Sequence, residues 1–64
     1  MMQEIFKIEI AGYNIILLQN NHANFTVQYG AKIESNLDYS KSAKSIGFCI
    51  MHALSCDGKI NNGE

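Results

Sequence analysis

Cys49, His52 and Cys56 are the residues in this 64-residue sequence whose types and spacing could do chemistry. Thiolate and imidazole are preferred zinc ligands, and spacings of three and four residues place side chains on one face of a helix. Structural zinc sites normally have four ligands, and the sequence offers a fourth only if His22 contributes from a distant turn. We therefore predict no metal and no cofactor, with both cysteines as reduced thiols. A zinc site at Cys49, His52 and Cys56 is the alternative.

Catalytic machinery is the second chemistry to consider. Cys49 and His52 could act as nucleophile and base, but the sequence identifies neither a third orienting group nor oxyanion donors. The five glycines are scattered singly and form no phosphate-binding loop. Glu4 and Glu9 are five residues apart and would point to opposite faces of a strand, so they cannot act together as a carboxylate pair in general acid–base catalysis. We predict that the protein is not an enzyme.

The charge balance argues against nucleic acid as a partner. The chain has five lysines, no arginine and six carboxylates, which give a formal net charge of −1 at pH 7. It therefore lacks the basic field that non-specific binding to nucleic acid or anionic membranes requires. Without arginine it also lacks the planar fork that binds phosphate or guanine edges in bidentate fashion. A nucleic-acid binder that uses its sheet remains as an alternative.

The length of the chain bounds both its stability and its location. Apolar residues occupy 47% of the 64 positions, yet a single core of this size rarely supplies more than ~3–5 kcal/mol. The two cysteines permit at most one disulfide, so we expect self-association to add stability. The longest apolar run, 15–18, is far shorter than the roughly 20 residues of a membrane span, and the N-terminus lacks the pattern of a secretory signal. We predict a cytoplasmic protein.

Three segments show the composition of strands, and short polar turns separate them. The strands are predicted at 4–10, 15–19 and 25–29, with turns at 11–14 and 20–24. We expect the third strand to run on to Ile33 with a bulge or bend at Gly30, and we interpret 34–37 as a linker. The sequence therefore predicts a three-stranded antiparallel meander.

One helix follows the strands. Asp38 is a suitable N-cap for a helix over 39–57, and Gly58 fits the left-handed position that ends such a helix. Residues 61–64 are expected to form a flexible tail. We predict that 1–60 form a single α+β domain with the order β-β-β-α, in which the helix packs on the meander and the whole forms a dimer.

The two sides of the predicted helix differ in composition. At about 100° per residue, one arc is apolar or small and is expected to pack on the sheet. This arc contains Tyr39, Ala43, Ile46, Gly47, Ile50, Ala53 and Leu54. Because glycine is unfavourable inside a helix, we expect Gly47 to have a packing reason. The opposite side carries Phe48 and Met51 beside lysine and serine, a composition typical of a protein–protein interface.

The second predicted strand also exposes apolar surface. Residues 15–18 are apolar on both faces, although one helix can cover only one face of a sheet. We therefore predict a contact surface that joins copies of this chain or binds a partner. Its residues are Phe48, Met51, His52, Ser55, Lys44, Ile16 and Leu18.

Residues 43–60, together with the predicted β-β-β-α order, resemble small phage- and prophage-encoded proteins of the kind that inhibit host defence. This resemblance implies a protein that acts by stoichiometric binding and has no catalytic motif. We therefore expect a non-enzymatic, phage- or mobile-element-encoded protein that forms a homo-oligomer and masks a host protein.

A small-ligand binder is the alternative from a different class. Tyr13, Tyr29 and Phe48 could stack on a base, and Lys41 and Lys44 near the helix N-terminus could meet a phosphate. Such a protein would sequester a nucleotide-like metabolite in a pocket between subunits.

Overall fold

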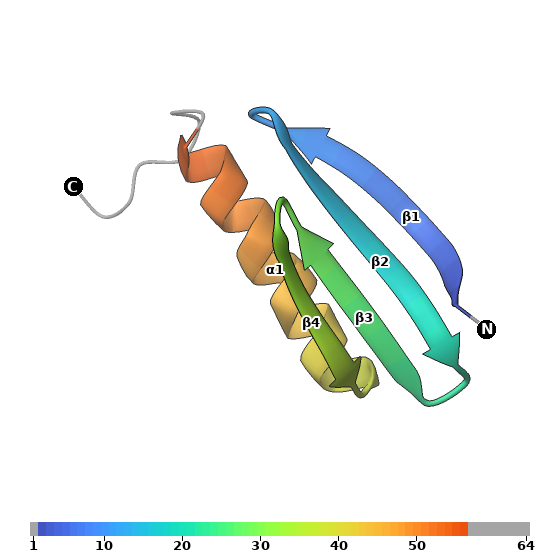
Figure 1. The fold of residues 1–64 in the computed structure, drawn as a ribbon. Helices are drawn as coiled ribbons and strands as arrows, with labels where there is room; N and C mark the ends of the chain where they lie inside the picture. Colours follow the sequence, from blue (N-terminus) through green and yellow to red (C-terminus); the bar gives the residue numbers. More distant parts are fainter. Residues whose placement is uncertain (1, 57–64) are drawn as a thin grey trace.

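Alternating apolar and polar residues build a sheet from the first part of the chain, and the helix that follows packs on it (Figure 1). The computed structural model describes residues 2–56. In chain order, the elements are β1 (Gln3–Ile10), β2 (Tyr13–Asn21), β3 (Asn24–Tyr29), β4 (Lys32–Leu37) and α1 (Tyr39–Cys56). The predicted class, an α+β fold with an antiparallel sheet followed by one helix, is confirmed. The predicted helix end at Gly58 and the tail at 61–64 lie outside the described residues.

The sheet has four strands in the order β1-β2-β3-β4, so the predicted number of three was wrong. Gly30, with a φ of +59°, lies in a hairpin turn where the sequence predicted only a bulge or bend, and Lys32 thereby pairs with Tyr29. Residues 34–37, interpreted above as a linker, belong to β4. Their polar character suits an edge strand. Asn36 has a φ of +60° at the point where the register with β3 shifts.

The other two hairpins have tight turns that are shorter than the predicted turn segments. Ala11 and Gly12 have φ values of +55° and +83°, the positive angles that a type I′ turn requires. In the second turn, Oδ1 of Asn21 accepts hydrogen bonds from the backbone N–H groups of Ala23 (2.9 Å) and Asn24 (3.1 Å). Such side-chain bonds stabilise a turn by satisfying its backbone donors. Both turns bring consecutive strands into antiparallel pairs.

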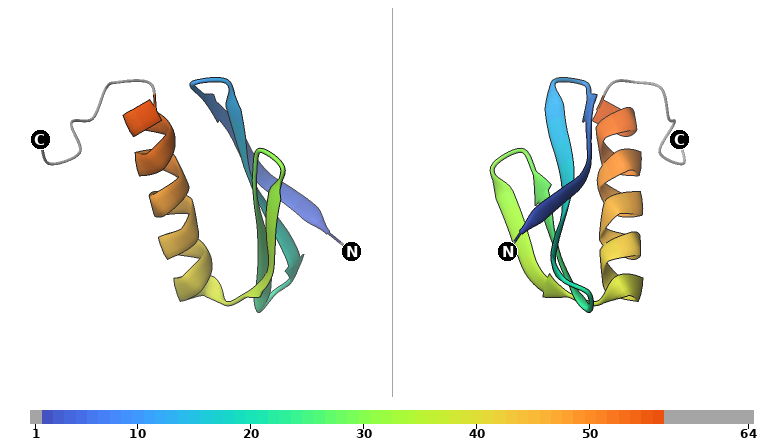
Figure 2. Two further views of the ribbon diagram at one scale, coloured as in Figure 1. Left: turned by 60° about the vertical axis from the view of Figure 1, so that its left-hand side comes forward. Right: turned by 90° about the vertical axis from the view of Figure 1, so that its right-hand side faces the viewer.

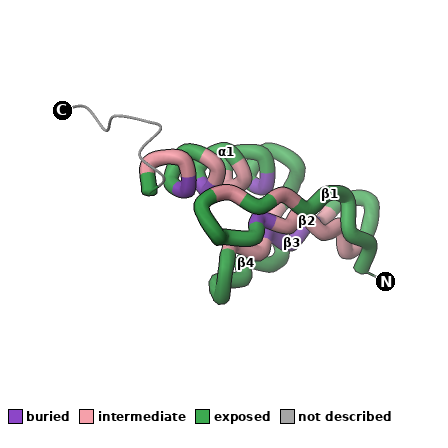
Figure 3. The backbone as a smooth tube through the Cα atoms, turned by 90° about the horizontal axis from the view of Figure 1, so that it is seen from above, coloured by how far each residue is buried: buried purple, intermediate pink, exposed green. Residues whose placement is uncertain are grey.

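Helix α1 begins at the predicted position. Oδ1 of Asp38 accepts a hydrogen bond of 2.7 Å from the backbone N–H of Lys41, which confirms Asp38 as the N-cap. The helix lies along one face of the sheet and leaves the other face open (Figure 2). Seen from above, α1 and the sheet form two layers, and the helix packs chiefly against β3 and β2 (Figure 3).

The side of α1 that faces the sheet differs from the predicted side. The buried helix residues are Ser42, Cys49 and Ala53. Tyr39, Ala43 and Gly47, which were expected to face the sheet, are exposed instead. The helix is therefore rotated about its axis by roughly 80° from the predicted orientation, at about 100° per residue. Burial of a serine is possible because the Ser42 hydroxyl donates a 2.9 Å hydrogen bond to the carbonyl oxygen of Tyr39.

Gly47 lies in the middle of α1 with open space around it. No atom beyond its chain neighbours and its own helix backbone lies within 4 Å of the place that a Cβ would occupy, so the expected packing reason is not found among the described residues. Gly47→Ala is expected to raise the free energy of unfolding by about 0.5–1 kcal/mol, because alanine loses less backbone entropy in a helix. Urea unfolding followed by circular dichroism measures this change. A lower stability for the variant would contradict the exposed placement.

The hydrophobic core is small. Its buried centre consists of Ile15, Val27, Cys49 and Ala53, and Ile15 is the only large side chain among residues 2–56 that is fully buried. Partly buried side chains pack around this centre. They are Ile8, Ile10, Leu17, Tyr29, Leu37, Ile46 and Ile50. Many of the large apolar side chains of residues 2–56 are therefore exposed or only partly covered.

Candidate functional site

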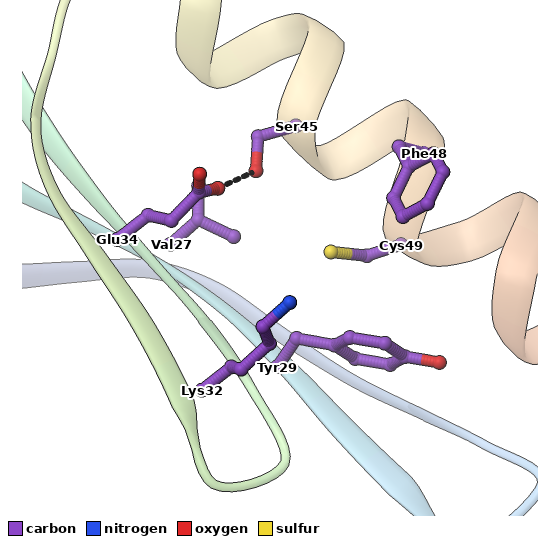
Figure 4. Close-up of a pocket in the computed structure, with 7 residues that line it drawn as sticks. All are labelled: Val27, Tyr29, Lys32, Glu34, Ser45, Phe48 and Cys49. Carbon is purple, nitrogen blue, oxygen red and sulfur yellow. Dashed lines mark hydrogen bonds between the residues drawn. The ribbon is translucent and has the colours of Figure 1, made fainter.

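A pocket opens between α1 and the strands β3 and β4 (Figure 4). Its volume is about 130 Å³, which is comparable to the ~150 Å³ of an engineered cavity that holds benzene. Alternation directs every second side chain of β3 and β4 toward the helix, and one flank of α1 supplies the opposite wall. The lining residues are Val27, Tyr29, Lys32, Glu34, Ser45, Phe48 and Cys49.

Lys32 and Glu34 give the β4 wall of this pocket one charge of each sign. They are two residues apart on one strand and therefore lie on the same face. Oε1 of Glu34 accepts a hydrogen bond of 2.7 Å from the hydroxyl of Ser45, which ties β4 to α1. The sequence reasoning missed both charged residues, because it placed Lys32 in a continuation of the third strand and interpreted 34–37, which includes Glu34, as a linker. The signal that could have found them is the Lys-x-Glu spacing directly after the turn at Gly30.

A row of aromatic rings connects the sheet to the C-terminal half of α1. The ring centroids are 5.3 Å apart for Tyr13 and Tyr29, 5.8 Å for Tyr29 and His52, and 6.0 Å for His52 and Phe48. A 2.8 Å hydrogen bond joins the hydroxyl of Tyr29 to Nδ1 of His52. Ring contacts at these separations favour one relative orientation of the side chains. The row ends at Phe48, which lines the pocket.

The outward side of α1 exposes two large apolar side chains. Phe48 is 68% exposed and Met51 is 56% exposed. Lys44 and His52 are exposed beside them, and Ser55 is half-buried. We call these residues of α1 the helix patch. The structure thus brings the helical members of the predicted contact surface together on one side of the molecule.

The two remaining members of that predicted surface, Ile16 and Leu18, lie elsewhere. Ile15 and Leu17 pack into the core under α1, so their neighbours along β2 point to the open face of the sheet. Ile33, which is 63% exposed, lies on the same open face. The predicted contact residues are therefore divided between two opposite sides of the protein.

The residues proposed to bind a nucleotide-like ligand converge only in part. Tyr29 and Phe48 line the pocket and Tyr13 contacts Tyr29, but neither Lys41 nor Lys44 lines it. Tyr29 contacts His52 in the last part of α1, whereas Lys41 lies about 16 Å earlier along the helix at ~1.5 Å per residue. Lys44 is exposed on the helix patch and does not line the pocket. The cation that lines the pocket with Tyr29 is Lys32.

Cys49, His52 and Cys56 do not form a common ligand set. Cys49 is buried and Cys56 is exposed, with its Sγ 4.0 Å from Nδ1 of His52. Within residues 2–56, no three side chains of His, Cys, Asp or Glu are arranged to hold a metal ion. The β2–β3 turn, which contains His22, lies at the opposite end of the molecule from the C-terminal end of α1 (Figure 1). The zinc alternative has no support in this arrangement.

The thiol of Cys49 and the hydroxyl of Tyr29 both hold their protons more tightly than usual. Burial raises the pKa of Cys49 above its ordinary value of 9.0, and the negative charge of Glu34 raises it further. Burial is also the main cause that raises the pKa of Tyr29 above 10.0. A thiol with a raised pKa supplies little of the thiolate that a nucleophile or a zinc ligand needs.

Stability is expected to fall as the pH rises above about 9, the ordinary pKa of the cysteine thiol. The folded chain keeps the protons of Cys49 and Tyr29 to a higher pH than the unfolded chain does. Above the ordinary thiol pKa the unfolded chain therefore binds fewer protons than the folded chain, so the free energy of unfolding decreases with increasing pH. Below that pKa the contribution of these two groups to stability is fully present. Urea unfolding across the alkaline range tests this, with Cys49→Ala expected to shift the onset upward, toward the titration of Tyr29. Stability that increased in this range would contradict the prediction.

A wider apolar groove lies on the other flank of α1, against β1. Its volume is about 380 Å³. The lining residues are Ile5, Phe6, Leu17, Phe25, Tyr39, Ser42, Ala43 and Ile46. Tyr39 stands at its border, 78% exposed, with its ring edge-on to Phe25 at 6.3 Å.

No protein-family model, curated protein or solved structure matches this chain. No helix within residues 2–56 combines the length and the apolar character needed to cross a membrane.

Proposed function

We propose that the protein is a non-enzymatic interaction protein that self-associates and binds a second protein through the helix patch. The observation that carries this proposal is the exposure of Phe48 and Met51 on a chain whose described residues contain one fully buried large side chain, Ile15. Burying a side chain of this size stabilises a complex by ~1.5–3 kcal/mol. Polar residues border the two apolar side chains, as they do at interfaces.

Only one of the two apolar residues of the patch borders the pocket. Phe48 borders the pocket on the β4 side of α1, whereas Met51 is not among the residues that line either hollow. We assign Phe48 to self-association and Met51 to the partner. Two associated copies present the partner-binding surface twice, which raises the apparent affinity through avidity. The partner we propose is a host protein in the cytoplasm, in line with the resemblance to small phage-encoded inhibitors.

Sedimentation at micromolar concentration tests the self-association. The wild type, with a chain mass of 7.1 kDa, is expected to sediment as a dimer, and Phe48→Asp as a monomer, because a carboxylate at that position would be buried without a partner. Tyr39→Asp is the matched control, since this residue is also exposed on α1 but lies on the other flank. A monomeric wild type, or a Phe48→Asp variant that remains dimeric, would refute the assignment of Phe48.

Affinity capture from the natural host, read by mass spectrometry, tests the partner. Met51→Asp is expected to remain dimeric and to lose the captured protein, whereas Tyr39→Asp should retain it. A captured protein that is unaffected by Met51→Asp would place the partner surface elsewhere.

A further inference from the structure

Strand β4 forms one edge of the sheet and lies beside the pocket. It pairs with β3 on one side, and no strand of residues 2–56 occupies its other side. Backbone N–H and C=O groups along such an edge are able to pair with another strand. Their spacing and the side chains around them decide which strand fits.

The backbone of Ile33 is directed to this free edge. Gly30 and Ala31 form a two-residue turn, so Tyr29 and Lys32 are the pair that closes the hairpin. Hydrogen-bonded and non-hydrogen-bonded pairs alternate along an antiparallel ladder, which turns the N–H and C=O of the next residue, Ile33, away from β3. Its side chain is 63% exposed on the open face of the sheet.

The charges on β4 are self-complementary about Ile33. We infer that β4 pairs antiparallel with β4 of a second copy across a two-fold axis at Ile33, which joins the two sheets into one. This register places Lys32 opposite the partner's Glu34, and symmetry repeats the contact. A register centred on Glu34 would instead bring two carboxylates opposite each other, which is unfavourable.

The same arrangement covers surface that a single copy leaves open. Lys32, Glu34 and Phe48 all line the pocket on the β4 side of α1. A second copy joined at β4 carries its own helix on the same side of the combined sheet, with its own Phe48 flank toward the axis. The exposed ring of Phe48 then lies between the two helices. The inference thus rests on the proposed self-association and specifies its geometry.

The opposite edge, β1, is the natural comparison because it contains the same tripeptide. Lys7, Ile8 and Glu9 repeat the Lys-Ile-Glu order of β4. Ile8, however, is half-buried against the core, whereas Ile33 is 63% exposed, so pairing about the β1 tripeptide would cover less apolar surface at its central residue. Variants of β1 therefore serve as matched controls.

Charge exchange on β4 tests the register by sedimentation equilibrium. Lys32→Glu sets two carboxylates opposite each other at two symmetric places, and we expect the dimer to weaken by about 10-fold or more. The double variant Lys32→Glu/Glu34→Lys restores opposite charges and is expected to recover most of the wild-type affinity. Lys7→Glu on β1 should leave the dimer unchanged.

Disulfide cross-linking tests the position of the axis. In a Cys56→Ser background, Ile33→Cys is expected to form a covalent dimer under mild oxidation, because directly opposed residues of a hydrogen-bonded pair are ~5.5 Å apart at Cα. Glu9→Cys is expected to remain monomeric in the same denaturing gel. Circular dichroism verifies that each variant is folded.

The outcomes separate this inference from the proposed function. One outcome is that Phe48→Asp dissociates the dimer, Lys32→Glu leaves it intact and Ile33→Cys forms no covalent dimer. In that case β4 pairing is overturned and self-association through α1 stands. If Lys7→Glu weakens the dimer and Lys32→Glu does not, the edge is β1. A monomeric wild type overturns both proposals.

Discussion

The variant Ile15→Ala is expected to be unfolded at 25 °C. Ile15 is 0% exposed, and it pairs with Ile8 on β1 and with Tyr29 on β3 at the centre of the sheet under α1. Removing such a side chain costs about 2–5 kcal/mol. That loss is of the same size as the ~3–5 kcal/mol of stability that a single core of this size rarely exceeds. Far-UV circular dichroism and amide chemical-shift dispersion measure the loss of structure.

Ile16→Ala is the matched control for this experiment. Ile16 is the next residue of the same strand, but it lies half-buried on the open face of the sheet. The same chemical change is expected to cost about 1 kcal/mol or less there, and the variant should remain folded. Equal losses for the two variants would show that the core face of β2 is misassigned.

The variant Ala53→Leu is expected to lose about 1–3 kcal/mol of stability through overpacking. Ala53 is 0% exposed where α1 meets the sheet, so the added carbon atoms of leucine have no space without a shift of the helix. Ala43→Leu introduces the same atoms on the same helix. Ala43 is exposed at the border of the groove against β1, so this change is expected to alter stability by about 0.5 kcal/mol at most.

This pair of variants measures the rotation of α1 about its axis. The amphipathic arc of the sequence predicted that both alanines face the sheet, and the structure separates them. Urea unfolding of the two variants distinguishes these arrangements. If Ala43→Leu lost as much stability as Ala53→Leu, the predicted orientation of the helix would be correct and the described one wrong.

Local residue patterns were sufficient to predict four of the five elements. Alternation in β1 and β3 and the apolar run in β2 identified the first three strands. The burial of a strand face leaves an apolar pattern in the strand's own sequence, whichever element covers that face. Asp38 identified the start of α1, because the capping bond is made within one turn of chain.

Strand β4 could not be predicted in the same way. Ser35 and Asn36 are poor strand residues, and Asn36 needs a positive φ. They form a strand because β3 supplies backbone partners along one side. Because this stabilisation comes from the backbone of β3, it leaves no alternation of apolar and polar residues in the sequence of β4. The pocket wall formed by Lys32 and Glu34 was missed for the same reason.

The sequence by itself determined the class of the fold, the position of the helix cap and the presence of surplus apolar side chains, since each depends on local spacing or on composition. The tertiary structure alone decided which side of α1 meets the sheet. Packing against β2 and β3 selected Ser42, Cys49 and Ala53, whose small side chains allow close approach. That choice placed Phe48 at the pocket between α1, β3 and β4 and left Met51 exposed, because a helix can bury only one of its sides against a sheet.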